Sequence, residues 1–377
     1  MLSTAQRTPG LRLTATTGPE ISAGTTPAAV PVPAHDPRTH GFLPERPPVR
    51  TMAGTWSRLT ALAGAAATAP DLETARDLVA RAARDGALTA LRQRVSRLSP
   101  RNADAAAMRV AVTVAACGWT GLDPVAPAAR CAADAAFLDL WAAVAHRVGH
   151  QQFVALPTLA LLNWAPERKP RRHLPIDQLA RTETLVPVVR WSPQGQPLGR
   201  LDRLMLATTR LEAHGSWLFR LAETLAGCDP ADASTATALR RLIRVQHTLR
   251  AQLRSEAAAL RAAPAPARQC AVLAALAAQG MLEPPVLQAA DAVLMGARRA
   301  GDGSRQQARR LLPARHRAWL SAMDRHCAPV RTLAHRGGPG AAVYREAQES
   351  LIALRRAYTG LVCCAARPDG GPLTAAA

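Results

Sequence analysis

One amphipathic stretch near the end of the chain, residues 344–362 (YREAQESLIALRRAYTGLV), constrains the fold more than any other. Its apolar and aromatic residues recur at steps of three and four, which places them on one face of an α-helix. They are Tyr344, Ala347, Leu351, Leu354, Tyr358 and Leu361. Glycine and proline at 337–340 mark the break in front of this helix. The pattern predicts a packed helix with Tyr358 turned inward and Arg355, one turn earlier, at the edge of the same face.

The composition favours helices along the whole chain. Apolar residues make up 48% of the 377 residues, with Ala and Leu dominant, whereas Phe, Tyr and Trp contribute only 3%. Helix-forming residues are therefore abundant, and residues typical of strands are scarce. We find no hairpin pattern and no repeat of about 20–50 residues, the signature of a solenoid. The sequence predicts an all-α protein.

Hydrophobic periodicity predicts roughly ten helices. Before the final one they cover residues 56–98 with a break at 69–70, 105–116, 134–148, 153–164, 201–225, 232–263, 269–280, 286–300, 304–311 and 315–327. Asp104 is the expected N-cap of the helix at 105–116. The proline-rich residues 166–200 are expected to form an irregular connection with a short extended piece at 186–191.

The same patterns divide the chain into four parts. Residues 1–33 are expected to be a disordered tail, 34–150 a small helical part, 151–365 a large helical part, and 366–377 a second disordered tail.

The formal charge of +20 comes almost wholly from arginine, since Lys169 is the only lysine. The arginines are spread along the predicted helices instead of forming one tail, so we expect a solvated basic surface and no nucleic-acid partner. The alternative, an arginine-driven nucleic-acid binder, predicts affinity that collapses with salt. We expect no membrane partner, because no apolar stretch reaches the roughly 20 residues of a bilayer span.

Seven scattered cysteines without a CxxC pair argue against a disulfide framework or a zinc site and favour reduced thiols in a cytoplasmic protein. Signatures of common soluble enzymes are missing, namely GxxxxGK, GxGxxG, HExxH and GxSxG. His146 and His150 are one helical turn apart, but Gly149 between them indicates a helix end, and we interpret both as surface residues.

Five segments, taken in order, resemble the indoleamine 2,3-dioxygenase family of haem proteins, and the resemblance extends from His35 to about Ala365. They are HDPRTHGFLP from His35, VGHQQFVALPTLALLNW at 148–164, EPPVLQAADAVLMG at 283–296, LLPARHRAWL at 311–320, and the last helix. The resemblance implies an all-α, indoleamine 2,3-dioxygenase-like helical fold with a small N-terminal and a large C-terminal helical part.

The family holds haem through a histidine in its last helix, in a pattern close to LRxxH. Here residues 354–358 run LRRAY, so Tyr358 stands at the ligand position. The resemblance implies haem b with Tyr358 as the metal ligand, which requires a phenolate and hence a pKa below the usual value of about 10. Arg355 is expected to lower that pKa. Asp291 matches an acidic residue that couples to this arginine near the haem, although an ordinary ion pair between two helices is the alternative.

On the other side of the haem, EAHGSW at 212–217 matches a family segment that carries small residues. The resemblance implies that Gly215 keeps space open there and that His214 or Ser216 hydrogen-bonds a ligand of the iron. The alternative for His214 is a solvent-facing or satisfied core residue. The family's GGSAGQSS loop is replaced by LAAQGMLEPP at 276–285. The family segment that carries a substrate-facing arginine corresponds to a shortened one between Glu256 and Cys270, where Arg261 and Arg268 are the only basic candidates for binding a substrate carboxylate.

Two functions follow from these observations. The first is a haem-dependent oxygenase-like enzyme that acts on tryptophan, an indole or a related small aromatic compound. Because an anionic oxygen ligand stabilises ferric iron, ferric or peroxide-using chemistry is expected of it. The second is a haem-free, degenerate family member that serves as a binding or scaffold protein, with Tyr358 a hydrogen-bonded core residue.

Overall fold

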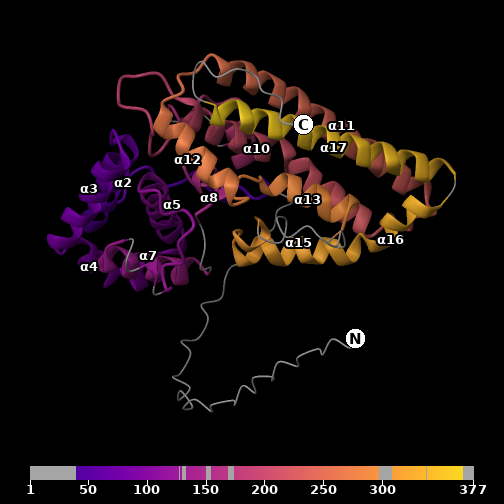
Figure 1. Ribbon diagram of the computed structural model, residues 1–377. Helices are drawn as coiled ribbons and strands as arrows, with labels where there is room; N and C mark the ends of the chain where they lie inside the picture. Colours follow the sequence, from indigo (N-terminus) through magenta and orange to yellow (C-terminus); the bar gives the residue numbers. More distant parts are fainter. Residues whose placement is uncertain are drawn as a thin grey trace, which may run out of the picture. The chain divides into compact units, whose positions relative to one another are not determined.

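The computed structural model describes residues 40–126, 128–129, 133–149, 154–168, 174–296, 308–336 and 338–367. They belong to one compact unit that begins at His35. Within the described residues the chain is mostly helical, with two short strands, which confirms the all-α prediction (Figure 1). Both predicted tails, residues 1–33 and nearly all of 366–377, lie outside the described residues.

The N-terminal helices are α2 (Ser57–Thr68), α3 (Leu72–Arg84), α4 (Ala87–Arg92), α5 (Pro100–Ala116) and α7 (Ala135–Val148). The C-terminal ones are α8 (Leu156–Leu161), α9 (Ile176–Thr182), α10 (Arg200–Ala226), α11 (Ala233–Arg261), α12 (Ala267–Ala278), α13 (Pro285–Leu294), α15 (Ala314–His326), α16 (Ala328–Arg331) and α17 (Pro339–Ala366). Short 3-10 turns lie at Gly54–Trp56, Val95–Arg97 and Thr332–His335.

Helix α10 is the centre of the C-terminal part. Eighteen of its residues are buried, distributed over almost its whole circumference, as in a helix surrounded by others. It packs against α8, α9, α11, α12, α13, α15, α16 and α17. Helices α11 and α17 also pack closely against each other along much of their length (Figure 1). The side chains that α10 sends toward these neighbours form the candidate site.

Several predicted helix ends are wrong by a few residues. Helix α17 begins at Pro339, because proline is favourable at the first position of a helix. Helix α5 begins at Pro100 and not after Asp104, since the Ser99 hydroxyl caps the Asn102 amide at 3.4 Å. Helix α8 ends at Leu161. The helices expected at 286–300 and 304–311 lie partly outside the described residues.

The connection at 166–200 is more regular than predicted. Strands β1 (Trp164–Pro166) and β2 (Leu185–Pro187) pair antiparallel, with Trp164 opposite Pro187, and α9 lies between them in the chain. This pair is not a hairpin, because α9 intervenes, and β2 coincides in part with the extended piece predicted at 186–191. The Asn163 side chain hydrogen-bonds both the amide and the carbonyl of Val189, at 2.7 and 2.9 Å, and continues the pairing beyond three residues.

Two of the segments that suggested a family resemblance meet in the core. Phe42 stacks on His316 with ring centroids 4.3 Å apart and makes edge contacts with Phe219 and Trp319. Gly41 has a φ of +64°, and a Cβ there would lie 2.9 Å from the Phe219 ring. The HGFLP turn therefore requires glycine both for its backbone conformation and for its packing.

Arg268 joins the N-terminal helices to the C-terminal ones. From α12 its guanidinium donates to Ala66 and Ala116, at 2.7 and 3.0 Å, and it also bonds Ala69. These carbonyls close the last turns of α2 and α5, where backbone acceptors lack helical partners. Arg268, a candidate for binding a substrate carboxylate, thus serves as a cap that holds two helix ends together.

Candidate functional site

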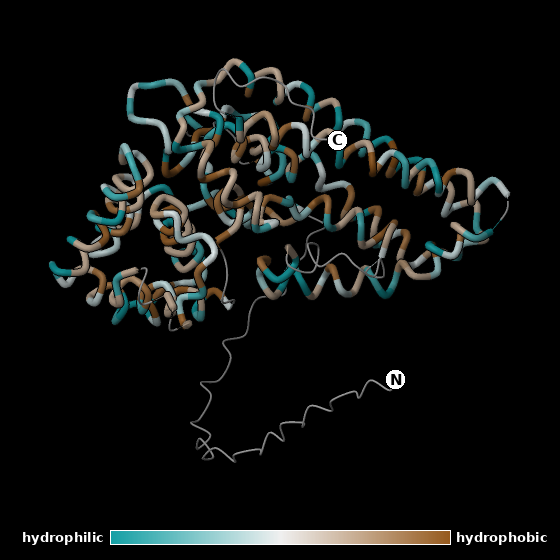
Figure 2. Tube along the Cα trace, viewed as in Figure 1, coloured by the Kyte–Doolittle hydropathy of each residue, from teal (hydrophilic) through white to brown (hydrophobic). Residues whose placement is uncertain are grey.

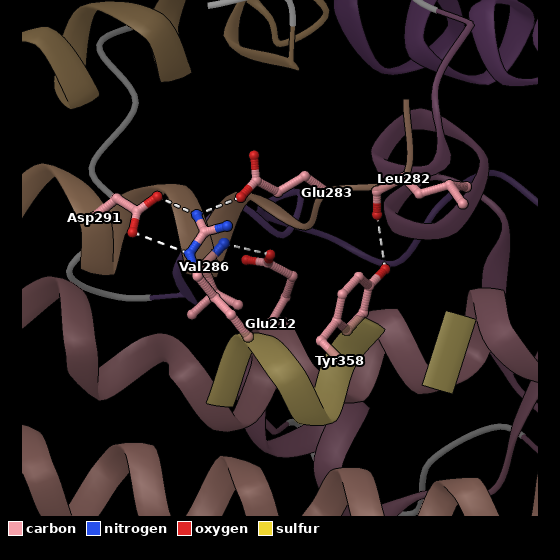
Figure 3. Close-up of polar contacts among 7 residues, drawn as sticks. Glu212, Leu282, Glu283, Val286, Asp291 and Tyr358 are labelled. Carbon is pink, nitrogen blue, oxygen red and sulfur yellow. Dashed lines mark hydrogen bonds and ion pairs between the residues drawn. The ribbon is translucent and has the colours of Figure 1, made fainter. Parts of the chain in front are cut away.

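The predicted ligand Tyr358 lies where α10, α13 and α17 meet (Figure 3). The apolar face of α17 turns it inward as the periodicity predicts, and the side chain is 5% exposed. Its hydroxyl donates a hydrogen bond to the Leu282 carbonyl at 2.8 Å, just before α13 begins. The phenol therefore has a partner within the protein.

Burial raises the pKa of Tyr358 above its usual value, and the negative charges of Glu283 and Glu212 add to the shift. A side-chain hydrogen bond with Thr208 opposes it. Arg355, expected to lower this pKa, is not among the groups that shift it. The protein environment thus favours the neutral phenol.

Arg355 is held by two carboxylates. Its guanidinium bonds both oxygens of Asp291, with the Nε–Oδ1 distance at 3.1 Å, and also forms an ion pair with Glu283 (Figure 3). The structure therefore brings the predicted residues Arg355 and Asp291 together. It also explains why Arg355 leaves Tyr358 unaffected, since its charge is directed at the segment leading into α13 and at α13 itself.

Glu212 is the site residue that sequence reasoning missed. Its side chain is fully buried on α10, and its Oε1 accepts a hydrogen bond from the Val286 amide at 2.7 Å, at the start of α13 (Figure 3). Its Oε2 has no hydrogen-bond partner among the described residues. Burial raises the pKa of Glu212 to about 8. The one available signal was its place in the EAHGSW segment, inside the helix predicted at 201–225.

Gly215 lies against α13 rather than beside an open space. A Cβ at this position would overlap Cγ2 of Val286 and lie 3.3 Å from its Cβ. The glycine therefore allows α10 and α13 to approach closely, and the Val286 side chain occupies the volume that the resemblance assigns to the far side of a haem.

The predicted residues His214 and Ser216 belong to a different network, on the α9 side of α10. The Ser216 hydroxyl donates to Asp177 at 3.3 Å, and Asp177 pairs with Arg181 at 2.8 Å. His214 is half-buried, and its pKa is lowered by burial and by the charges of Arg181 and Arg210. Neither side chain shares a hydrogen bond with Tyr358 among the described residues.

A haem group is the cofactor that the resemblance implies, and the residues described here do not fit it. Ligation by tyrosine requires a phenolate, whereas Tyr358 is held as a phenol by burial and by its bond to Leu282. Val286 fills the space beside Gly215. The arrangement is instead that of a packed junction between three helices, with one buried carboxyl group.

The remaining histidines and cysteines singled out from the sequence do not form a cluster among the described residues. The described residues contain no group of three or more His, Cys, Asp or Glu side chains placed to hold a metal ion. His146 lies in the last turn of α7, and His150 lies outside the described residues. Cys131 also lies outside them, and the six described cysteines are free thiols.

None of the helices that the structure describes combines the length and the apolar character needed to cross a membrane. Among known proteins, no family model matches the chain, and no curated protein matches it. The resemblance to indoleamine 2,3-dioxygenases therefore stays a prediction.

Proposed function

We propose that this chain is a haem-free helical binding protein, the second of the two functions that its sequence predicts. The hydrogen bond from the Tyr358 hydroxyl to the Leu282 carbonyl, 2.8 Å long, carries the proposal. A buried phenol that donates a hydrogen bond to a backbone carbonyl is a core residue with its polar end satisfied. It has no tendency to become the anion that iron ligation needs.

The neighbours of Tyr358 support the same proposal. Glu212 is buried at this junction with a pKa of about 8, so a neutral carboxyl predominates near pH 7. Val286 packs against Gly215 and closes the gap between α10 and α13. This close packing supports a junction that holds no cofactor.

The competing proposal is a haem-dependent oxygenase that acts on tryptophan, an indole or a related aromatic compound. It draws support from the Arg355–Asp291 ion pair, which the resemblance associates with the cofactor. That pair also includes Glu283 and holds α17 against α13 and the segment before it without any cofactor. For this reason we favour the binding protein.

A haemin titration followed by ultraviolet–visible absorption separates the two proposals. We expect no stoichiometric Soret shift for the wild type or for Tyr358→Phe. Tyr358→His should bind none either, because Val286 still occupies the space. Circular dichroism of each variant controls for folding. A 1:1 ferric spectrum with a phenolate charge-transfer band, lost in Tyr358→Phe, would overturn the proposal and support the oxygenase.

A further inference from the structure

Helix α11 carries an unusual outer surface. One side of it packs against α10 and α17 through residues such as Leu242, Leu249 and Leu253, and polar and apolar residues alternate along it accordingly (Figure 2). The opposite side is exposed and holds most of the arginines of this helix. We call these residues the arginine face: Arg240, Arg241, Arg244, Arg254 and Arg261.

The arginine face has no acidic residue to balance it. The single carboxylate of α11, Glu256, is turned inward, 9% exposed, and pairs with Arg210 of α10 at 3.0 Å. No arginine of the face takes part in an ion pair with another described residue. Exposed His247 lies between Arg244 and Arg254 and adds no negative charge. The positive charge of this face is therefore available to a partner.

The neighbouring helix α17 shows that this is not a general property of exposed helices here. Its exposed residues Arg345 and Arg356 share the helix with exposed Glu346 and Glu349. Mixed charges of that kind describe an ordinary solvated surface. Helix α11 differs because no exposed glutamate or aspartate accompanies its exposed arginines.

Four of the arginines lie on one side of the helix. At about 100° per residue, Arg240, Arg244, Arg254 and Arg261 fall within a sector of about 100° around the helix axis. The 21 residues from the first to the last span about 32 Å at the α-helical rise of about 1.5 Å per residue. A row of guanidinium groups of this length suits a rigid, repeating anion.

The other exposed residues of α11 decide which anion. Apart from His247 they are small or hydroxylated, namely Ala233, Ser234, Thr237, Thr248, Ala251, Ser255 and Ala258. A protein partner is normally recognised through a buried aromatic or large apolar centre, a membrane through an apolar wedge, and a single-stranded nucleic acid through aromatic side chains that stack on its bases. Apart from the His247 imidazole, the exposed residues of α11 include none of these. Arginine with serine and threonine is the composition that contacts phosphate oxygens.

We propose that the arginine face of α11 binds the phosphate backbone of double-stranded nucleic acid without reading its sequence. The arginines of the chain as a whole predict no nucleic-acid partner, because they are spread over many helices. On α11, folding gathers them on one uncompensated face. The inference names a partner for the proposed binding role and rests on it.

Fluorescence anisotropy with a labelled 20-base-pair DNA duplex tests the inference between 50 and 200 mM salt. We expect log K to fall linearly with log salt. Arg240→Gln/Arg244→Gln/Arg254→Gln should weaken binding about tenfold or more at low salt and reduce the slope by roughly three, about 0.9 for each lost phosphate contact.

The control is Arg81→Gln/Arg345→Gln/Arg356→Gln, which removes the same charge from exposed positions on α3 and α17. It should leave the slope nearly unchanged. Equal losses in the two triple variants would overturn the inference, because only net charge would then matter. No binding by the wild type, or tighter binding of a polyglutamate peptide than of the duplex, would overturn it as well. The haemin titration involves none of these residues, so the two tests fail independently.

Discussion

The two sides of α10 treat buried carboxyl groups in opposite ways. Toward α13, Glu212 is fully buried, its one hydrogen bond comes from a backbone amide, and burial raises its pKa to about 8. Toward α9 and α11, Asp177 pairs with Arg181 at 2.8 Å and Glu256 pairs with Arg210 at 3.0 Å. Within the part of the chain that the structure describes, Glu212 has no cationic partner, whereas Asp177 and Glu256 each have one. We call the surroundings of Glu212 the neutral side of α10 and the other the ion-paired side. The ion pairs of Arg355 with Asp291 and Glu283 join α17 to α13 and its leading segment and do not involve a carboxyl group of α10.

This difference shows why the site predicted from sequence was wrong to combine Tyr358 with Ser216 and His214. Tyr358 belongs to the neutral side, whereas Ser216 and His214 belong to the ion-paired side. The arginines on the ion-paired side reach solvent, since the Arg181 and Arg210 side chains are 22% and 28% exposed. A buried carboxylate keeps its charge where the long side chain of an arginine partner can stay partly hydrated. A carboxyl group is held neutral where helices bury it without such a partner.

Glu212→Gln should have the largest effect on this comparison. A carboxyl whose folded pKa lies above its unfolded value of 4.5 destabilises the folded protein increasingly as pH rises from 4.5 to about 8. Glutamine keeps the acceptor for the Val286 amide and never ionises. The variant's free energy of unfolding, relative to the wild type, should therefore increase by about 3–5 kcal/mol across that window.

Denaturant unfolding at pH 5, 6.5 and 8 measures this change. The matched substitution on the other side, Asp177→Asn, should instead lower the free energy of unfolding at pH 8 by about 1 kcal/mol, because Arg181 loses its partner. If wild type and Glu212→Gln gave parallel pH profiles, the neutral character of the α13 side would be refuted.

The sequence predicted which way side chains on a helix point, because hydrophobic periodicity determines this. It did not predict their partners or pKa shifts, which depend on what buries them. The apolar stripe of the last helix turned Tyr358 inward correctly, and it placed Arg355 at the edge where Asp291 meets it. The second partner, Glu283, and the direction of the Tyr358 pKa shift depend on which segment packs over the stripe. That packing is set by residues more than 70 positions away in the chain.

The pairing of β1 with β2 around the connection at 166–200 was missed for a similar reason. Proline-rich residues 166–200 carry no long periodic pattern, and β1 and β2 are three residues each. The Asn163 side chain extends this pairing, because its amide group bonds the backbone amide and carbonyl of Val189 as a strand residue would. Glu212 was overlooked because a glutamate on an interior face has no special sequence signature when no arginine accompanies it.

Gly215→Ala should disrupt the contact between α10 and α13. The added methyl group would overlap Val286, and overpacking of this kind costs about 1–3 kcal/mol of stability. Thermal or denaturant unfolding measures the loss, which Val286→Ala in the same protein should partly relieve. Gly64→Ala on α2 is the control, since nothing lies within 4 Å of its Cβ position and helix propensity favours alanine there. Equal effects at both glycines would contradict the close approach.

Ser216→Ala should have the smallest effect. It removes one hydrogen bond, 3.3 Å long, to Asp177, which keeps Arg181. A loss of about 0.5–1 kcal/mol in the free energy of unfolding is expected. A loss above about 2 kcal/mol would show that the ion-paired side is as tightly constrained as the neutral one and would remove the contrast between them.

The central claim, that Tyr358 is a neutral core phenol, can be measured directly because the chain has only two tyrosines. The other, Tyr344, bonds the Leu294 carbonyl, and burial raises its pKa to about 12. In Tyr344→Phe, tyrosinate absorbance near 295 nm reports on Tyr358 alone. We predict no tyrosinate at neutral pH and none through the ordinary phenol pKa of 10.0, with the signal appearing only as the protein unfolds. Tyrosinate in the folded protein at neutral pH would contradict the claim and restore the phenolate ligand.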